Sequence, residues 1–117
     1  MKLIEIKEKN MSCPFCDMFK NTNKDVIDIV PLNPVVPGHR IVIPRAHVKD
    51  FSEDPQVTAR VMEYASAMCN DARGNGDMNL ITSKGKSATQ TVFHLHVHLV
   101  PRHEGDGLTL PWTGQKK

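Results

Sequence analysis

The sequence predicts an α+β fold in which an antiparallel sheet of about five strands carries one main helix on one face. Two patterns indicate it: short runs rich in β-branched residues recur between turn residues, and one longer segment has apolar residues at helical spacing. The 117 residues fit one domain, since domains span roughly 100–200 residues. We therefore expect a single domain over 1–117, with a motif-bearing core at 13–102 between a short N-terminal extension and a C-terminal tail.

Three strands are expected in the N-terminal half of the chain, over 3–7, 26–30 and 40–43. The second and third are short runs of β-branched residues that end at prolines, and proline stops regular pairing because it has no N–H to donate. The polar stretch 20–24, between the first two strands, is expected to be a loop.

The main helix is expected over 54–73. Asp54 can accept hydrogen bonds from the first free N–H groups, Pro55 fits the first helical position, and Gly74 ends the helix. The face turned to the core is marked by apolar residues at helical spacing. These are Val57, Val61, Tyr64, Ala65, Met68 and Ala72.

Two further strands are expected over 78–82 and 92–100, joined by the polar loop 83–89. The last strand has the strongest alternation in the chain, and alternate residues of a strand point to opposite faces of a sheet. Its apolar face should lie in the core, so we expect this strand at the centre of the sheet. Its other face carries His94, His96 and His98.

Composition and charge disfavour several classes of protein. The 15 basic and 13 acidic residues are too balanced for a duplex-binding surface, and 5% aromatic residues are too few for a single-strand stacking platform, so we do not expect a nucleic-acid partner. The longest apolar runs fall far short of the ~20 residues that span a bilayer. The charged N-terminus does not resemble a signal peptide. We expect a cytoplasmic protein without a membrane partner.

The three alternating histidines point to a chemical site. Their side chains are spaced about 6.6 Å along a strand, which suits either zinc ligands or a nucleophile with phosphate-binding neighbours. The loop before them favours phosphate, because it is rich in hydroxyl, amide and backbone N–H donors. No Asp or Glu occurs between 78 and 102 to assist a metal-bound nucleophile. The donors are Ser83, Gly85, Ser87, Gln90 and Thr91.

The segment His94-Leu-His-Val-His-Leu-Val100, followed by Pro101-Arg102, resembles the signature of the histidine triad (HIT) superfamily of nucleotide hydrolases and transferases. The segment 33–44 is similar to the first signature of that family, and Gln90-Thr-Val leads into the triad as in many members. The resemblance implies a homodimer that cleaves a purine nucleoside phosphoramidate or phosphoanhydride and releases an AMP-like product.

The resemblance also implies roles for individual residues, without a metal in the chemistry. His96 attacks the α-phosphorus and forms a covalent nucleotidyl-histidine, while His98 and Thr91 donate to the non-bridging oxygens. Gln90 lies near the leaving group. The same cleft is expected to include His39, Ser83 and Thr89.

The chain departs from the family pattern at two places on the nucleoside side. Pro31 stands where many members have an Asp or Asn that accepts from the ribose, and proline has no such acceptor. The segment 16–39 is also shorter than in many relatives, which implies a trimmed base pocket. The nucleobase is therefore left open.

The motif Cys13-Pro-Phe-Cys16 has three interpretations. It is similar to the active site of glutaredoxin, which would make the chain a thiol-disulfide oxidoreductase, although Phe93 stands where that family has proline after Thr-Val. The cysteines could also be two buried free thiols. In HIT members with such a pair, zinc is held by both cysteines, a histidine after the Ile-Pro segment and the first triad histidine. The resemblance therefore implies a closed structural zinc site of Cys13, Cys16, His47 and His94. A non-catalytic nucleotide-binding protein is the remaining alternative.

Overall fold

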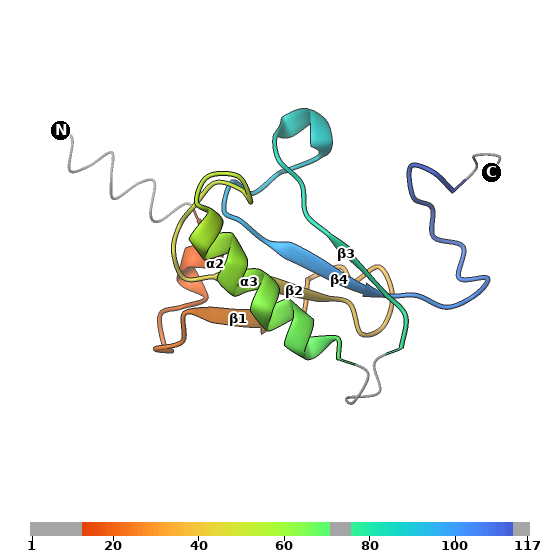
Figure 1. The fold of residues 1–117 in the computed structure, drawn as a ribbon, viewed down its shortest axis with the longest axis horizontal. Helices are drawn as coiled ribbons and strands as arrows, with labels where there is room; N and C mark the ends of the chain where they lie inside the picture. The colour runs from red at the N-terminus through yellow and green to blue at the C-terminus, as the bar shows by residue number, and fades with distance from the viewer. Residues whose placement is uncertain (1–12, 71–75, 114–117) are drawn as a thin grey trace.

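The computed structural model describes residues 13–70 and 76–113, and its strands form one antiparallel sheet (Figure 1). The strands are β1 (Val26–Ile29), β2 (Arg40–Pro44), β3 (Met78–Ile81) and β4 (Val97–Pro101), in the order β1-β2-β4-β3. The predicted α+β class is confirmed, and β4 lies inside the sheet as expected. The sheet has four strands rather than five, because the strand expected over 3–7 lies outside the described residues.

The main helix, α3 (Pro55–Met68), begins as the sequence predicts. The Asp54 side chain accepts from the N–H groups of Gln56 and Val57, at 3.0 and 3.4 Å, and Pro55 occupies the first turn. The helix ends at Met68 with Cys69 as its C-terminal cap, so the predicted bound of 73 is too late, and 71–73 lie outside the described residues. The expected stop at Gly74 lies outside the described residues.

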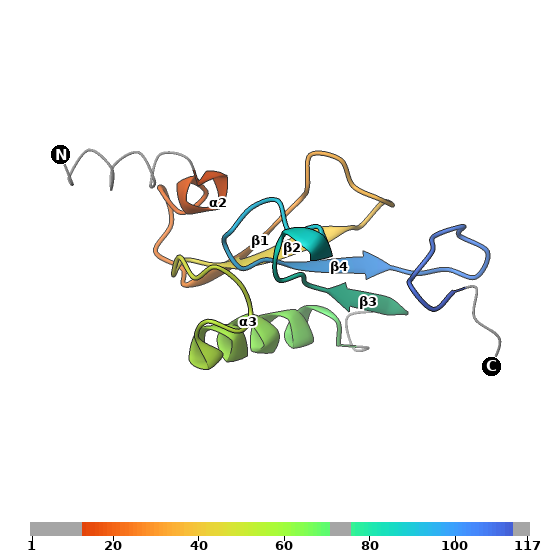
Figure 2. The same cartoon turned by 90° about the horizontal axis from the view of Figure 1, so that it is seen from above.

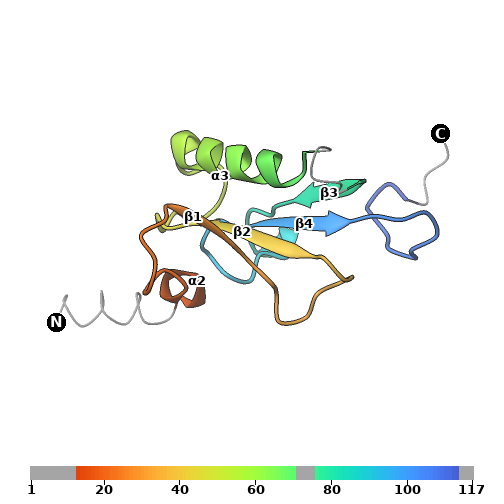
Figure 3. The same cartoon turned by 90° about the horizontal axis from the view of Figure 1, so that it is seen from below.

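Two hydrophobic clusters lie on opposite faces of the sheet. Figures 2 and 3 show α3 covering one face, while the short helix α2 (Pro14–Asp17) lies on the other. The cluster under α3 includes Val61 and Val97, both almost fully buried, and each such side chain contributes roughly 1.5–3 kcal/mol. The cluster on the α2 face is built from Phe15, Phe19, Ile41, Ile43 and Cys13.

The predicted strand over 92–100 is regular only from Val97, and this boundary was wrong. The pairing of β2 with β4 places Val42 opposite Val97, so continuing it would bring Pro44 opposite Leu95, and proline has no N–H for the ladder. The chain instead bends, and the N–H of Leu95 donates to the carbonyl of Val48 at 2.7 Å. The alternation of faces nevertheless persists, since Leu95 packs in the cluster under α3 whereas His94 contacts Phe15 on the other face.

Two short helices were not predicted. α2 follows Cys13, whose Sγ accepts from the N–H of Cys16 at 3.3 Å, with Pro14 in the first turn. The 3-10 helix η2 (Lys86–Ala88) lies within the predicted loop 83–89, where Gly85 has a φ of 92° and Thr89 a φ of 69°. Within the described ranges, no helix is both long and apolar enough to cross a membrane.

Candidate active site and metal centre

The three histidines of the predicted triad lie on the face of the sheet opposite α3. His98 belongs to β4 and pairs with Ile41 of β2 and Ile81 of β3, which places it in the middle of the sheet. His94 and His96 precede β4 in the chain, and the ring centroids of His96 and His98 are 5.3 Å apart. His94 is 0% exposed, whereas the other two rings are partly accessible.

One ring nitrogen of His96 is fixed by the backbone. Nδ1 lies 2.8 Å from the carbonyl oxygen of His94. A carbonyl oxygen can only accept, so Nδ1 carries the hydrogen and donates it. In the neutral ring, Nε2 therefore has a free lone pair. This is the state of imidazole that can act as a nucleophile.

A chain of hydrogen bonds fixes the opposite tautomer in His98, with the ring hydrogen on Nε2 rather than on Nδ1. The N–H of Val35 donates to Nδ1 of His39 at 3.0 Å, so the hydrogen of the neutral His39 ring lies on Nε2. That Nε2 is 2.9 Å from Nδ1 of His98 and donates to it. His98 must then carry its own hydrogen on Nε2, which makes it a hydrogen-bond donor at this position.

Burial keeps both members of this pair uncharged. It lowers the pKa of His98 from 6.5 to about 4, and repulsion from His96 and His39 adds to the effect. Burial also lowers the pKa of His39, which is 4% exposed. Both rings are therefore neutral near pH 7, as the hydrogen-bond chain requires.

A cleft of about 240 Å³ opens over these histidines, which we call the histidine cleft. It contains most of the residues that the sequence predicts for catalysis or substrate binding. Thr91 is exposed and is not among the residues that line the cleft. The lining residues are Val35, His39, Ile81, Ser83, Thr89, Gln90, His96, His98 and Val100.

Gln90 lines the histidine cleft, but its amide is engaged in holding the loop before the triad. Its Oε1 accepts from the N–H of Gly85 at 2.8 Å. Its Nε2 donates to the carbonyls of Lys49, at 2.7 Å, and Val92, at 3.1 Å. Because Gln90 is 3% exposed and both polar atoms are bonded, the geometry favours a role in positioning the loop.

The four residues predicted as metal ligands lie together on the α2 side of the sheet. Each offers one ligand atom, and the four atoms lie within 4.8 Å of one another. Nδ1 of His94 is 3.4 Å from Sγ of Cys13, 3.7 Å from Sγ of Cys16 and 3.1 Å from Nδ1 of His47. Sγ of Cys16 is 3.2 Å from Nδ1 of His47.

These separations fit zinc. Zn–S bonds of about 2.3 Å and Zn–N bonds of about 2.0–2.1 Å in a tetrahedron give sulfur–nitrogen edges of about 3.5 Å and nitrogen–nitrogen edges of about 3.3 Å. His94 is also in the tautomer that can bind a metal through Nδ1, because its Nε2 lies 2.8 Å from the carbonyl of Pro44 and donates to it. Nδ1 is then free to bind a metal, and the carbonyl fixes the orientation of the ring.

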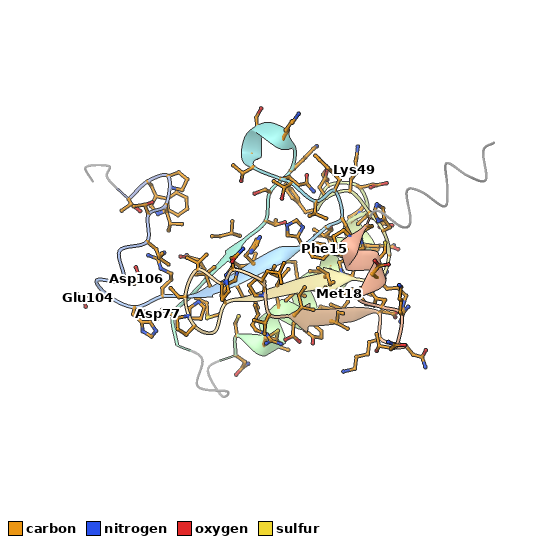
Figure 4. All side chains as sticks on the ribbon, turned by 180° about the vertical axis from the view of Figure 1, so that it is seen from behind. Phe15, Met18, Lys49, Asp77, Glu104 and Asp106 are labelled. Atoms are coloured by element: carbon orange, nitrogen blue, oxygen red, sulfur yellow. The ribbon has the colours of Figure 1, made fainter. Side chains whose placement is uncertain are left out.

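Phe15 contacts two of the triad histidines, and the sequence analysis did not assign it to the site. Its ring packs edge-on against His96 and His94, at centroid distances of 5.0 and 5.8 Å, and Figure 4 shows it over the sheet. The sequence did hold a signal for this contact, since Phe15 stands between two candidate zinc ligands.

The contact of His39 with His98 is a second one that the sequence analysis did not identify. It joins residues 59 positions apart, so it depends on the pairing of β2 with β4.

Comparison with known proteins gives consistent matches. The family model described as HIT domain matches residues 18–105. An uncharacterized HIT-like protein from Mycoplasma genitalium is 32% identical over 111 residues, which cover 84% of this chain and 78% of that protein. An adenylylsulfatase from Arabidopsis thaliana is 28% identical, covering 90% of this chain and 59% of its own length.

Solved structures share the fold. A zinc-bound histidine triad family protein from Mycobacterium smegmatis has a TM-score of 0.71 at 33% identity, covering 86% of this chain and 81% of that one. A HIT family hydrolase from Clostridium thermocellum has a TM-score of 0.70 at 29% identity, covering 85% of this chain and 97% of that one.

Proposed function

The chain belongs to the HIT family, and we propose that it is a hydrolase or nucleotidyltransferase that cleaves a purine nucleoside phosphoramidate or phosphoanhydride. The similarity to a family hydrolase and to an adenylylsulfatase supports hydrolase-type chemistry on a nucleotide. The observation that carries the proposal is the hydrogen bond from Nδ1 of His96 to the carbonyl of His94, because in the neutral ring it directs the Nε2 lone pair away from that bond, and the ring lines the histidine cleft.

The reaction takes two displacements at phosphorus. In the first, the Nε2 lone pair of His96 forms a bond to the α-phosphorus, and the bond to the leaving atom breaks with its electron pair on that atom. A leaving amine takes up a proton from solvent. In the second, the oxygen of water bonds to the phosphorus and releases a proton to solvent, the N–P bond breaks, and its electron pair returns to Nε2. An AMP-like product is released, and another acceptor in place of water gives transfer instead of hydrolysis.

Donors around the cleft stabilise the charge that develops on the phosphoryl oxygens. His98 presents Nε2–H, because the chain from Val35 through His39 fixes its tautomer. The hydroxyl group of Ser83 lines the same cleft and supplies a further donor, whereas the Thr89 hydroxyl donates to the carbonyl of Ala88 and would have to rotate to reach a phosphate. Thr91 lies next to the cleft-lining Gln90, so we propose that it reaches the phosphate once substrate is bound.

We propose that zinc has a structural role at Cys13, Cys16, His47 and His94. The closed set of two sulfur and two nitrogen donors supports this role, because catalytic zinc sites keep an open position. The metal would supply no step of the chemistry. Its function would be to hold α2 against the triad segment through His94, whose carbonyl also orients His96.

The remaining expectations continue as parts of the proposal. The whole chain acts as one domain and pairs into a homodimer, which light scattering would test. The side chain of Pro31 offers the ribose no acceptor, so nucleoside recognition depends on other contacts. The similarity to glutaredoxin is confined to the cysteine motif, since the fold is that of the HIT family.

Activity assays separate the three candidate functions. Release of AMP from adenosine 5′-phosphoramidate, lost in His96→Ala, is the expected result. Glutathione-linked disulfide reduction that is lost in Cys13→Ser would favour the oxidoreductase. Binding of AMP without turnover of any phosphoramidate or phosphoanhydride would favour a non-catalytic nucleotide-binding protein.

A further inference from the structure

The two cysteines of the metal cluster stand close together on one short element. Cys13 caps the N-terminus of α2, and Cys16 lies in the first turn, where its N–H donates to Sγ of Cys13 at 3.3 Å. The two sulfur atoms are within 4.8 Å of each other. Side chains three residues apart on a helix have Cβ atoms about 5–6 Å apart, and a disulfide needs about 3.5–4.5 Å. A small shift within α2 therefore suffices to join the two sulfurs.

The third cysteine lies on the other side of the sheet. Cys69 packs against the cluster under α3, whereas Cys13 and Cys16 belong with the cluster on the α2 face. Figures 2 and 3 show α2 and α3 on opposite faces. The sheet separates Cys69 from the pair, so oxidation within one folded chain can join Cys13 only to Cys16.

The metal cluster is open to solvent on the side of Cys16 and His47. Cys13 is 6% exposed and His94 is 0% exposed, whereas Cys16 is partly accessible and His47 is exposed. A zinc ion keeps its thiolate ligands deprotonated, and the thiolate is the form that reacts with peroxides. A small oxidant in solvent therefore meets the sulfur of Cys16 first.

The histidines of the cluster have a hydrogen bond available to them when no metal is bound. Nε2 of His94 donates to the carbonyl of Pro44, so Nδ1 holds a lone pair. Nδ1 of His47 lies 3.1 Å from it and donates a hydrogen to it in the zinc-free state. The buried ring of His94 is then satisfied without a metal. Phe15 still packs against His94 and His96, so α2 keeps its place on the sheet.

The cluster can therefore exist in two satisfied forms, one with zinc on two thiolates and one with a disulfide beside a His47–His94 hydrogen bond. We propose that Cys13 and Cys16 are a site of reversible oxidation, at which a hydroperoxide converts the metal-binding pair into a disulfide and zinc is released. This inference rests on the proposed zinc site and adds a modification to it. The pair is the target of oxidation here, not a catalyst of disulfide exchange.

The chemistry balances with hydrogen peroxide as the oxidant. The thiolate of Cys16 bonds to one oxygen, the O–O bond breaks, hydroxide leaves, and Cys16 becomes a sulfenic acid. The thiolate of Cys13 then bonds to the sulfur of Cys16, the S–O bond breaks, and a second hydroxide leaves. The two sulfurs lose two electrons, the peroxide gains them, and two protons from solvent convert the hydroxides to water. The neutral disulfide no longer holds zinc, because zinc binds thiolates, and a dithiol restores the pair by exchange.

The test exposes the zinc-loaded native protein to hydrogen peroxide near neutral pH, stops the reaction with catalase and alkylates the remaining thiols in denaturant. Peptide mass spectrometry should find Cys13 joined to Cys16, with a loss of about 2 Da per disulfide, while Cys69 is alkylated. A chromogenic chelator should detect about one released zinc per disulfide. Dithiothreitol followed by zinc should restore both thiols and the bound metal. The oxidised protein should still unfold cooperatively in urea.

Cys69→Ser is the matched control, since it removes a cysteine outside the cluster and should leave the yield of released zinc unchanged. Retention of zinc at a peroxide concentration that oxidises Cys69 of the native protein overturns the oxidation site and leaves the zinc site standing. A disulfide that includes Cys69, a sulfinic acid at Cys16 that dithiothreitol does not reverse, or loss of cooperative unfolding on oxidation also overturns it. Native protein that binds no zinc overturns both.

Discussion

Protonation of His98 should destabilise the fold as the pH falls. Its pKa is about 4 in the folded chain and 6.5 in the reference state, because burial and the facing rings of His39 and His96 disfavour its charge. Between these values the unfolded chain binds more protons than the folded one. The free energy of unfolding therefore rises with pH, so this stabilisation is present above pH 6.5 and is lost as the pH falls toward 4.

The magnitude follows from the two pKa values. At 1.36 kcal/mol per pH unit, the interval from 6.5 to about 4 corresponds to about 3 kcal/mol. Most of it, about 2 kcal/mol, is lost between about pH 7 and about pH 5. The ring is partly accessible, and solvent screening makes this an upper value.

Urea unfolding of the native protein and His98→Asn, near pH 7 and near pH 5, measures this loss. The native protein should lose up to about 2 kcal/mol more than the variant over this interval. Acid also weakens metal binding, but both proteins share the cluster of cysteines and histidines, so the difference between them reports on His98. Equal losses in the two proteins, or a larger loss in His98→Asn, would refute the assignment of a half-buried, neutral ring.

Three further predictions concern stability and metal. Gln90→Met removes the hydrogen bonds to Gly85, Lys49 and Val92 from a buried site. It should lower the free energy of unfolding, measured with urea, by about 2–4 kcal/mol. An unchanged free energy of unfolding would contradict the positioning role of Gln90. Asp54→Ala removes the N-terminal cap of α3 and should cost about 1 kcal/mol in the same assay, with Glu63→Ala as an exposed control on the same helix. Protein purified without a metal-binding tag should contain about one zinc per chain, and chelation should lower its melting temperature; metal analysis finding well under one zinc would reject the site.

The elements that could be predicted from the sequence are those set by local patterns. Asp54 and Pro55 mark the start of α3 without reference to the rest of the chain, and the alternation of histidines with Leu95 and Val97 persists even where regular pairing fails. The boundary of β4 could not be predicted, because it depends on Pro44 standing opposite Leu95 across the sheet.

The candidate site could also be predicted only in part. The residue types of the triad and of the zinc cluster could be recognised by their spacing and resemblance. The tautomers of His96 and His98 could not, because they depend on the carbonyl of His94 and on the contact with His39. The bonds of Arg102 to Asp106 and Leu108 could not be predicted either, because they depend on the tertiary fold and leave no periodic pattern in the sequence.

The central claim is that Nε2 of His96 is the nucleophile. Rapid quenching of the protein with adenosine 5′-phosphoramidate, followed by peptide mass spectrometry, tests it most directly. We expect an adduct of the mass of AMP less water on His96, none in His96→Gly, and formation slowed by about 10²–10³-fold in His98→Ala, the loss of one electrostatic donor. An adduct on His98 in the native protein, or one that persists in His96→Gly, would contradict the account.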